Sequence, residues 1–175
     1  MAQAVKKTKN TEKIENKISK TNHPQNPVVK SLQTQLANSF VMYLNYKHYH
    51  WQTFGPLFRD MHRFFDELAE EVYATIDEIA ERTRMIGQNP LSRLDEIKEN
   101  ATVKTAAKNS DMREMINEAQ NNVVLIIKEM RDSIKIADDN DDPGTADVLT
   151  RHLQIYEKHE WFLRDILEQN DGLTS

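Results

Sequence analysis

The sequence predicts an all-α protein built as an antiparallel four-helix bundle. The chain of 175 residues contains only four glycines and five prolines, and long stretches lack both. In four long segments the apolar residues recur at intervals of three and four, as on the buried face of an amphipathic helix. Every glycine, and every proline beyond residue 30, falls at a boundary between such segments. The sequence has no strand-like alternation and no internal repeat, and its length fits one domain with a substantial core.

The first two helices are expected on either side of a short turn. The first runs from about residue 28 to near Phe54, and the second from Pro56 to about Ile86. The pair Gly55 and Pro56 closes one helix and starts the next. Gly87 then supplies the left-handed conformation on which helices commonly end. These two segments therefore form a helical hairpin.

The second half of the chain predicts another hairpin after a long connection. Residues 90–103 are enough to cross the bundle, and Ser92–Lys98 is expected to form a short helix within this crossover. The third long helix begins near Asp111, where Asp-x-x-Glu is a variant of the capping box. The fourth begins at Pro143, since proline is favoured at the first helical position, and is expected to end before Gly172.

Charge divides the chain into two regions. Residues 1–30 carry seven lysines and two glutamates, a local charge of +5. Since the whole chain has a net charge of −5, the remaining residues carry a charge of −10. This basic segment has almost no large apolar residues, so burial could not offset the entropy lost on ordering. We therefore expect a flexible lysine-rich tail at residues 1–27 and a bundle at 28–175.

Composition excludes several classes of function. Cysteine is absent, so disulfides, thiolate metal sites and cysteine nucleophiles are excluded. No apolar run approaches the length of a membrane span. The N-terminal lysines are not followed by an apolar segment, so no secretory signal is expected and a cytoplasmic location is the default.

Two pairs of candidate metal ligands lie on the second helix. His62 and Asp66 are four residues apart, as are Asp77 and Glu81, so each pair projects from one helical face one turn apart. From His62 to Asp77 the helix rises about 22 Å. This distance is too long for one chain to surround a single metal centre, so a closed oligomer is expected.

The residue types indicate the metal. Imidazole and carboxylate ligands without sulfur suit iron, zinc or manganese, and the share of carboxylates favours a hard, redox-active metal over a structural zinc. Di-iron bundles that hold their metals inside one subunit use Glu-x-x-His motifs. None of the six histidines has a glutamate three residues before it, so that type of centre is excluded.

The order of these residues resembles the Dps family, the ferritin-like mini-ferritins named as DNA-binding proteins from starved cells. The resemblance covers the chain beyond about residue 28, including residues 142–147 and 157–161. The residues that carry it on the first two helices are His50, Trp51, Gly55, Phe58, His62, Asp66, Asp77, Glu81, Arg82 and Gly87.

The resemblance implies a function and a site. It implies a hollow shell of twelve subunits that oxidises Fe(II), preferably with hydrogen peroxide, stores Fe(III) mineral and protects against oxidative damage. The centre would lie between two subunits, where the catalytic and metal-binding residues are His50, His62 and Asp66 from one chain and Asp77 and Glu81 from the other. Iron is the expected metal, with zinc as a substitute at the same site.

Other candidate residues admit two interpretations. His48 points away from His50 on a helix and is interpreted as a surface or interface residue. His152 and His159 lack a matching carboxylate pattern on their helix and are interpreted as structural or as adventitious metal contacts. Trp51 either packs or intercepts an oxidising equivalent. The acidic residues between 138 and 147 solvate a loop or, by the resemblance, line a pore that attracts cations.

Two other functions remain open from the sequence. Twelve copies of the basic tail would form a multivalent polycation that compacts DNA through salt-dependent phosphate contacts, with nucleoid association as a consequence. Against this, the tail lacks arginine and aromatic residues and adjoins an acidic body. The third function is a purely structural bundle that holds zinc at the same ligands.

Overall fold

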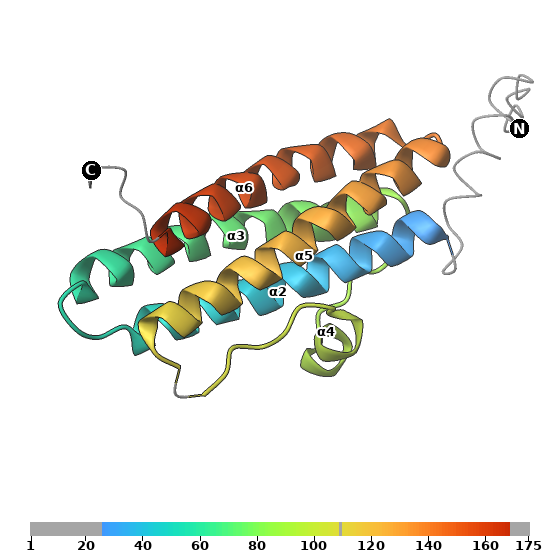
Figure 1. The fold of residues 1–175 in the computed structure, drawn as a ribbon. Helices are drawn as coiled ribbons and strands as arrows, with labels where there is room; N and C mark the ends of the chain where they lie inside the picture. Colours follow the sequence, from blue (N-terminus) through green and yellow to red (C-terminus); the bar gives the residue numbers. More distant parts are fainter. Residues whose placement is uncertain (1–25, 109, 169–175) are drawn as a thin grey trace, which may run out of the picture.

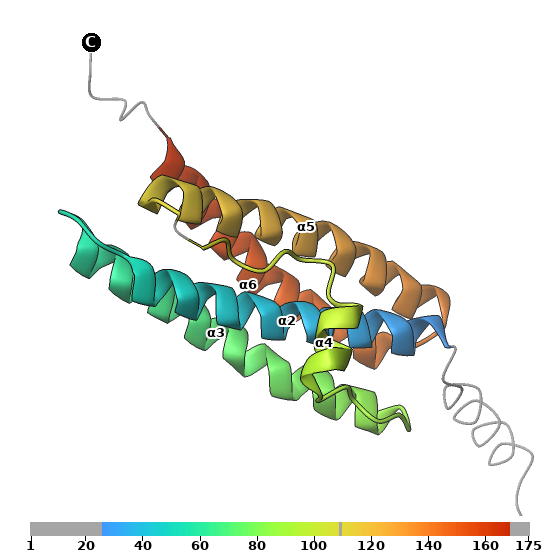
Figure 2. The same cartoon turned by 90° about the horizontal axis from the view of Figure 1, so that it is seen from below.

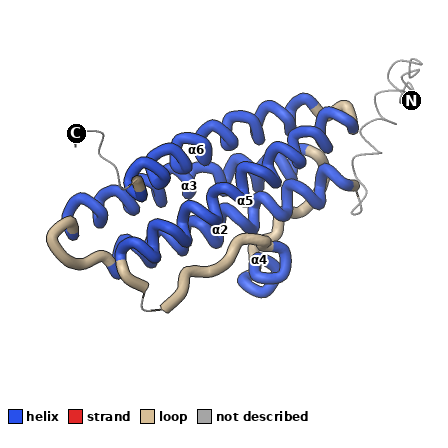
Figure 3. Tube along the Cα trace, viewed as in Figure 1, coloured by secondary structure: helices blue, strands red, loops and turns tan. Residues whose placement is uncertain are grey.

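The computed structural model describes residues 26–108 and 110–168, and within these residues every regular element is a helix (Figures 1 and 3). None of the helices in this part of the chain is long and apolar enough to cross a membrane. The elements are α2 (Pro27–Gln52), α3 (Phe58–Met85), α4 (Leu94–Asn100), α5 (Met112–Asp139) and α6 (Pro143–Leu167).

Four long helices form the bundle, and the prediction of its architecture is confirmed. The hairpin α2–α3 packs against the hairpin α5–α6, with α2 beside α5 and α3 beside α6 (Figures 1 and 2). The short α4 lies against α2, and the connection around it carries the chain back along the bundle (Figure 2). As a result α5 starts at the same end of the bundle as the α2–α3 turn (Figure 1).

The first helix begins at Pro27, one residue before the expected position near residue 28. Asn26 is the N-cap of α2, and its side-chain oxygen accepts a hydrogen bond from the backbone N–H of Val28 at 2.9 Å. Pro27 is the first helical residue, a position that proline tolerates because its missing N–H would have no partner there. The helix therefore takes up Pro27, the last residue of the expected tail, with Asn26 as its cap, and residues 1–25 lie outside the described residues.

The turn between α2 and α3 is wider than predicted. The first helix ends at Gln52 and the second begins at Phe58, whereas the sequence suggested Phe54 and Pro56. Gly55 has a φ of +87°, which interrupts helical geometry, and its carbonyl accepts the N–H of Phe58 at 3.0 Å. The extra residues separate the two helices while keeping the end of one beside the start of the other.

Boundaries in the second half follow local capping. In α4, which lies two residues later than expected, the Glu96 carboxylate accepts the backbone N–H groups of Ser92 and Arg93, each at 3.2 Å. In α5 the capping box is present as predicted, with Asp111 and Glu114 exchanging two hydrogen bonds of 2.9 Å. The last helix ends at Leu167, earlier than the expected boundary before Gly172.

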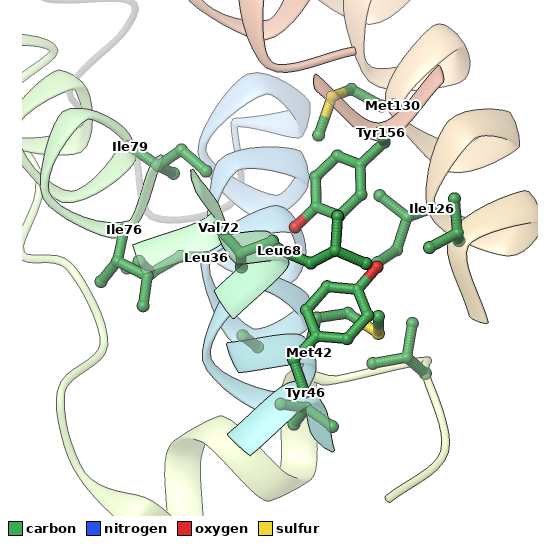
Figure 4. Packing of buried hydrophobic residues seen from close by; sticks show 14 of the residues in the cluster. Leu36, Met42, Tyr46, Leu68, Val72, Ile76, Ile79, Ile126, Met130 and Tyr156 are labelled. Atoms are coloured by element: carbon green, nitrogen blue, oxygen red, sulfur yellow. The ribbon is translucent and has the colours of Figure 1, made fainter. Parts of the chain in front are cut away.

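The core runs along the whole bundle and includes several tyrosines. Figure 4 shows Tyr46 of α2 and Tyr156 of α6 among aliphatic side chains from three helices, and both tyrosines are fully buried. Burying large side chains of this kind contributes on the order of 2 kcal/mol each. The fully buried aliphatic and aromatic residues of greatest volume also include Tyr49, Phe65, Leu32, Leu36, Met42, Ile79, Met115, Ile126 and Met130.

Buried amides fix the crossover to α2. The Asn38 side-chain oxygen accepts the N–H of Thr102 at 2.9 Å, and the Asn45 oxygen accepts that of Ala106 at 2.8 Å. Both asparagines are buried in the bundle. Because they satisfy loop backbone N–H groups that would otherwise lose their hydrogen bonds to water, these asparagines help the irregular connection to lie against the helices.

An ion pair joins the end of α3 to the start of α6. Arg82 donates to the Asp142 carboxylate at 2.5 Å and to the Thr145 hydroxyl at 2.9 Å. Asp142 is the N-cap of α6, is only 7% exposed, and accepts the backbone N–H of Thr145 at 3.0 Å. This contact connects two of the sequence motifs on which the family resemblance depends. It also holds Arg82 in place, the residue next to the candidate ligand Glu81.

We expect Arg82→Ala to lower the free energy of unfolding by about 3 kcal/mol, since it leaves the buried Asp142 carboxylate without its counter-ion. Chemical denaturation measures this change. The exposed Arg84 on the same helix is the matched control, and Arg84→Ala should cost far less. Equal losses for the two variants would contradict the role assigned to the buried pair.

Candidate metal centre

Two histidines meet at the α2–α3 turn. His50 lies in the last turn of α2 and His62 near the start of α3, and their rings stack with centroids 3.6 Å apart. The Nδ1 of His50 lies 2.6 Å from the backbone oxygen of His62, and the Nδ1 of His62 lies 2.8 Å from the backbone oxygen of His50. This reciprocal pair of hydrogen bonds holds both rings in place.

The reciprocal contacts determine which nitrogen carries the proton. A carbonyl oxygen can only accept, so each Nδ1 must be protonated and donate. In a neutral imidazole the remaining Nε2 then has a lone pair available for a metal. Backbone carbonyls thus supply the outer contacts that commonly orient metal-binding histidines, and the donor set fits a metal such as Fe(II).

Asp66 lies beside these histidines but is held by a lysine. Its Oδ1 accepts a hydrogen bond from Nζ of Lys47 at 2.5 Å and lies 3.9 Å from Nδ1 of His50. The hydrogen bond from Lys47 is the main cause that holds the pKa of the Asp66 carboxyl below its usual range, with the two histidines adding to it. Asp66 is therefore an ionised carboxylate at neutral pH, the form that binds a metal.

The other two candidate ligands lie apart from this group. Asp77 and Glu81 are exposed on α3. Asp66 and Asp77 are eleven residues apart, which is close to three full turns, so they share one face of α3 at a separation of about 16 Å. Within residues 26–108 and 110–168, no group of three or more His, Cys, Asp or Glu side chains is arranged to hold a metal ion.

In one chain His50 and His62 therefore stack with Asp66 nearby but do not form a complete ligand group with it, and Asp77 and Glu81 are exposed elsewhere on α3. Trp51 lies next to this group, with its ring 6.5 Å from that of His50, and is 64% exposed. Its indole is therefore not packed in the core of the chain.

Sequence reasoning missed a second set of histidine contacts. His159 and His152 of α6 are buried, and their Nε2 atoms each lie 3.1 Å from a carboxylate oxygen of α3, that of Glu71 and that of Glu78. The sequence analysis looked for carboxylates on the same helix and interpreted these histidines as structural or as adventitious metal contacts, whereas their carboxylate partners are on α3. The available signal was a matched spacing of seven residues in both pairs, with a basic residue before each histidine.

Burial sets the protonation of these histidines. It lowers the pKa of His159 to about 4, and it lowers the pKa of His152 in the same direction, although the nearby glutamates oppose the shift. Both are neutral at pH 7. They belong to the α3–α6 interface, and Nδ1 of His152 has no hydrogen-bond partner among the described residues.

Stability should consequently fall as pH decreases from about 6.5 to about 4. In this window the unfolded chain binds protons at His159 that the folded chain does not, and the shift corresponds to about 3 kcal/mol. Unfolding measured at several pH values tests this. His159→Gln should flatten the profile, and a variant profile parallel to the original would contradict the assignment.

Two further sequence expectations have a structural outcome. His48 is partly exposed and lines a cavity of about 290 Å³ with Gln52, away from the stacked histidines, as expected from its position on the helix. Of the acidic run at 138–142, Asp142 is buried as the helix cap and cannot line a pore. Exposed acidic residues remain at positions 138, 139, 141 and 147.

Comparisons with known proteins identify the family. The model of the ferritin-like domain matches residues 29–172. The DNA protection during starvation protein of Brevibacillus brevis is 36% identical over 137 residues, which cover 78% of this chain and 92% of that protein.

Solved structures agree. The X-ray structure of Dps from Thermosynechococcus elongatus has a TM-score of 0.84 and 44% identity, covering 89% of this chain and 99% of that one. The Dps protein of Vibrio cholerae O1, described as a member of a broad superfamily of ferritin-like diiron-carboxylate proteins, has a TM-score of 0.78 and 25% identity, covering 87% and 92%. The chain belongs to the Dps family of ferritin-like proteins.

Proposed function

We propose that this chain is the subunit of a hollow homo-oligomeric shell, a dodecamer, that oxidises Fe(II), preferably with hydrogen peroxide, and stores Fe(III) inside. The observation that carries the proposal is the pair of stacked histidines beside an ionised carboxylate, with both Nδ1 atoms engaged and both Nε2 atoms left for a metal. Membership of the ferritin-like diiron-carboxylate proteins supports iron as the metal.

The spacing on α3 supports a centre shared by two subunits. His62 and Asp66 precede the midpoint between residues 71 and 72 by the same number of positions as Glu81 and Asp77 follow it. A second copy of α3, antiparallel and related by a twofold axis near this midpoint, therefore brings the two pairs to the same level. Such a twofold interface contains two equivalent centres.

The surface between the two half-sites is suited to cover by another copy. Leu44 of α2 and Tyr73 of α3 are 53% and 62% exposed. Tyr73 lies one turn before Asp77 on the same face, and its ring is 5.3 Å from that of Tyr43. Exposed apolar and aromatic groups on the ligand-bearing face favour a protein interface there.

In this centre the residues of the chain bind and orient Fe(II) as the substrate. The imidazoles of His50 and His62 supply neutral nitrogen ligands, and Asp66 exchanges the Lys47 ammonium for the doubly charged ion. Asp77 and Glu81 of the second copy supply the remaining carboxylates. Two Fe(II) ions together provide the two electrons that reduce peroxide to water, so a one-electron step that releases hydroxyl radical is avoided.

The test is anaerobic loading with Fe(II) followed by peroxide or by dioxygen, with Fe(III) formation followed by absorbance and the mineral by electron microscopy. We expect faster oxidation with peroxide and an electron-dense core. Binding of Fe(II) without oxidation or mineral would contradict the proposal and favour the structural zinc alternative. Zinc added first is expected to occupy the same ligands and slow iron oxidation.

A second function, DNA binding, is supported by the local charge of +5 in residues 1–30 and by the names of the relatives. Since Asn26 and Pro27 start α2, the test variant should lack residues 1–25 only. It is expected to lose retardation of DNA while keeping iron oxidation, and retardation by the full chain should weaken steeply with salt. A full chain that leaves DNA unretarded at low salt would remove this function.

A further inference from the structure

A tyrosine, a histidine and a glutamate form a buried chain of hydrogen bonds between α2, α6 and α3. The Tyr46 hydroxyl lies 3.2 Å from Nδ1 of His159, and Nε2 of the same ring lies 3.1 Å from the Glu71 carboxylate. Tyr46 and His159 have no exposed surface. Lys158 Nζ contacts both oxygens of Glu71, at 2.6 and 2.5 Å.

The direction of each hydrogen bond follows from the charges. Partial burial opposes ionisation of Glu71, but hydrogen bonds from Lys158 and His159 outweigh it and hold the Glu71 pKa below its usual range. Ionised Glu71 can only accept, so His159 Nε2 carries the proton and donates. His159 is neutral, and its Nδ1 therefore accepts from the Tyr46 hydroxyl. The Tyr46 hydroxyl thus donates its hydrogen bond to the unprotonated Nδ1 of His159.

The hydroxyls of the other buried tyrosines do not pair with an imidazole. The Tyr49 hydroxyl donates to the Glu118 carboxylate at 3.2 Å, and the Tyr156 hydroxyl lies 3.4 Å from the Ser39 hydroxyl. A hydroxyl is a poor proton acceptor, whereas Glu118 of α5 is a carboxylate whose same oxygen already accepts the backbone N–H of Ala107 at 3.3 Å and which is partly exposed to solvent. Among the three, only Tyr46 contacts an imidazole through its hydroxyl.

Tyr46 also lies close to the proposed metal centre. It precedes His50 by one turn on α2, about 6 Å along the helix axis. Its ring centroid is 6.3 Å from that of Phe65, the residue before Asp66. An electron leaving Tyr46 would therefore cross little more than one layer of packed side chains.

We propose that Tyr46 is a built-in one-electron donor that removes stray oxidising equivalents from the metal centre, with His159 taking its proton. This inference rests on the proposed iron oxidation. When a single Fe(II) reduces peroxide, the O–O bond breaks to give hydroxide and a hydroxyl radical, a one-electron oxidant. Tyr46 gives one electron, directly or through neighbouring groups, and the radical with a proton from solvent becomes water.

The phenolic proton moves at the same time to Nδ1 of His159. Tyr46 becomes a neutral phenoxyl radical and His159 an imidazolium, whose charge is balanced by Glu71. An oxidised phenol is a much stronger acid than imidazolium, so the transfer is favourable even though burial makes His159 a weak base. The distance lies at the limit of the range for direct proton transfer.

The test compares tyrosine radicals by electron paramagnetic resonance in rapidly frozen samples. The assembled protein is given fewer Fe(II) ions than centres and then peroxide, so that unpaired oxidising equivalents form. Tyr46→Phe, which keeps the ring in the core, should lose the main signal, whereas Tyr49→Phe and Tyr156→Phe should keep it. A signal that survives in Tyr46→Phe would overturn the inference.

The role of His159 needs a readout that packing alone would not move. In His159→Gln, which retains a hydrogen-bonding side chain but no base, the radical yield should fall by at least about tenfold. The g-values of any remaining radical should lose the signature of a hydrogen bond from a cation to the phenoxyl oxygen. An unchanged yield and spectrum would overturn the proton-acceptor role.

An oxidant that needs no iron separates this inference from the proposed function. Photogenerated ruthenium(III) tris-bipyridine is applied to His62→Ala protein with and without Tyr46→Phe. A difference signal from Tyr46 here, even if the unaltered protein failed to oxidise iron, would support the relay by itself. Normal iron oxidation with no Tyr46 radical under either oxidant would overturn the relay and leave the proposed function standing.

Discussion

Shells in which every subunit carries His62→Ala are expected to oxidise Fe(II) on the order of a hundredfold more slowly than the unaltered protein. The substitution removes one imidazole from the proposed centre. It also removes the Nδ1–H that binds the backbone oxygen of His50, so the remaining ring loses its stacking partner as well. Stopped-flow absorbance after peroxide addition measures the rate.

His48 provides the matched control for this variant. It is a histidine two residues from His50 on the same helix, but its ring packs edge to face with that of Tyr49, with centroids 5.9 Å apart, and lines the cavity near α5. His48→Ala should leave the oxidation rate nearly unchanged. If His48→Ala and His62→Ala slowed oxidation equally, the loss would reflect general damage near the turn and not removal of a ligand.

Much of the fold could be predicted because local sequence patterns mark the ends and the buried faces of the helices. Pro143 and the Asp111 capping box mark helix starts at the positions where the structure has them, and Gly87, with a φ of +84°, follows the end of α3. The stripes of apolar residues assign the buried faces. The long crossover was predictable from its length, since fourteen residues are enough to cross the bundle, but the burial of Leu91, Ile97 and Val103 in the core was not.

Which residues pair between helices was harder to predict from the sequence. His159 and Glu71 are 88 residues apart, and their contact depends on how α3 and α6 lie side by side. The capping role of Asp142 was hidden in the same way, because an aspartate in an acidic run gives no sign that Arg82 reaches it from another helix. Local patterns specify elements well, whereas contacts between helices need the register that packing fixes.

The candidate centre shows the same division. His62 and Asp66 follow from one helical spacing, and His50 joins them because the turn is short. Lys47 was not singled out, although it is one turn before Trp51 and holds the Asp66 carboxylate. For Asp77 and Glu81, spacing predicted the separation from the histidines, and their place in a centre remains a proposal about two chains.

The central claim is that each centre takes ligands from two subunits, and co-assembly of two inactive variants tests it most directly. His62→Ala damages one half of the proposed centre and Asp77→Ala the other half, so each variant alone should oxidise Fe(II) poorly. In a mixed twofold pair, one centre receives its histidines from the Asp77→Ala chain and its carboxylates from the His62→Ala chain. That centre has all five ligands, whereas the second centre at the same interface lacks both His62 and Asp77.

Mixed shells, prepared by unfolding and refolding the variants together and verified by mass, should therefore recover activity that neither parent shows. When unlike chains pair, half of the centres are complete, so the recovered rate should approach half of the rate of unaltered shells. A centre built within one chain cannot be restored in this way. Mixed shells that oxidise Fe(II) no faster than the two parents would contradict the shared centre.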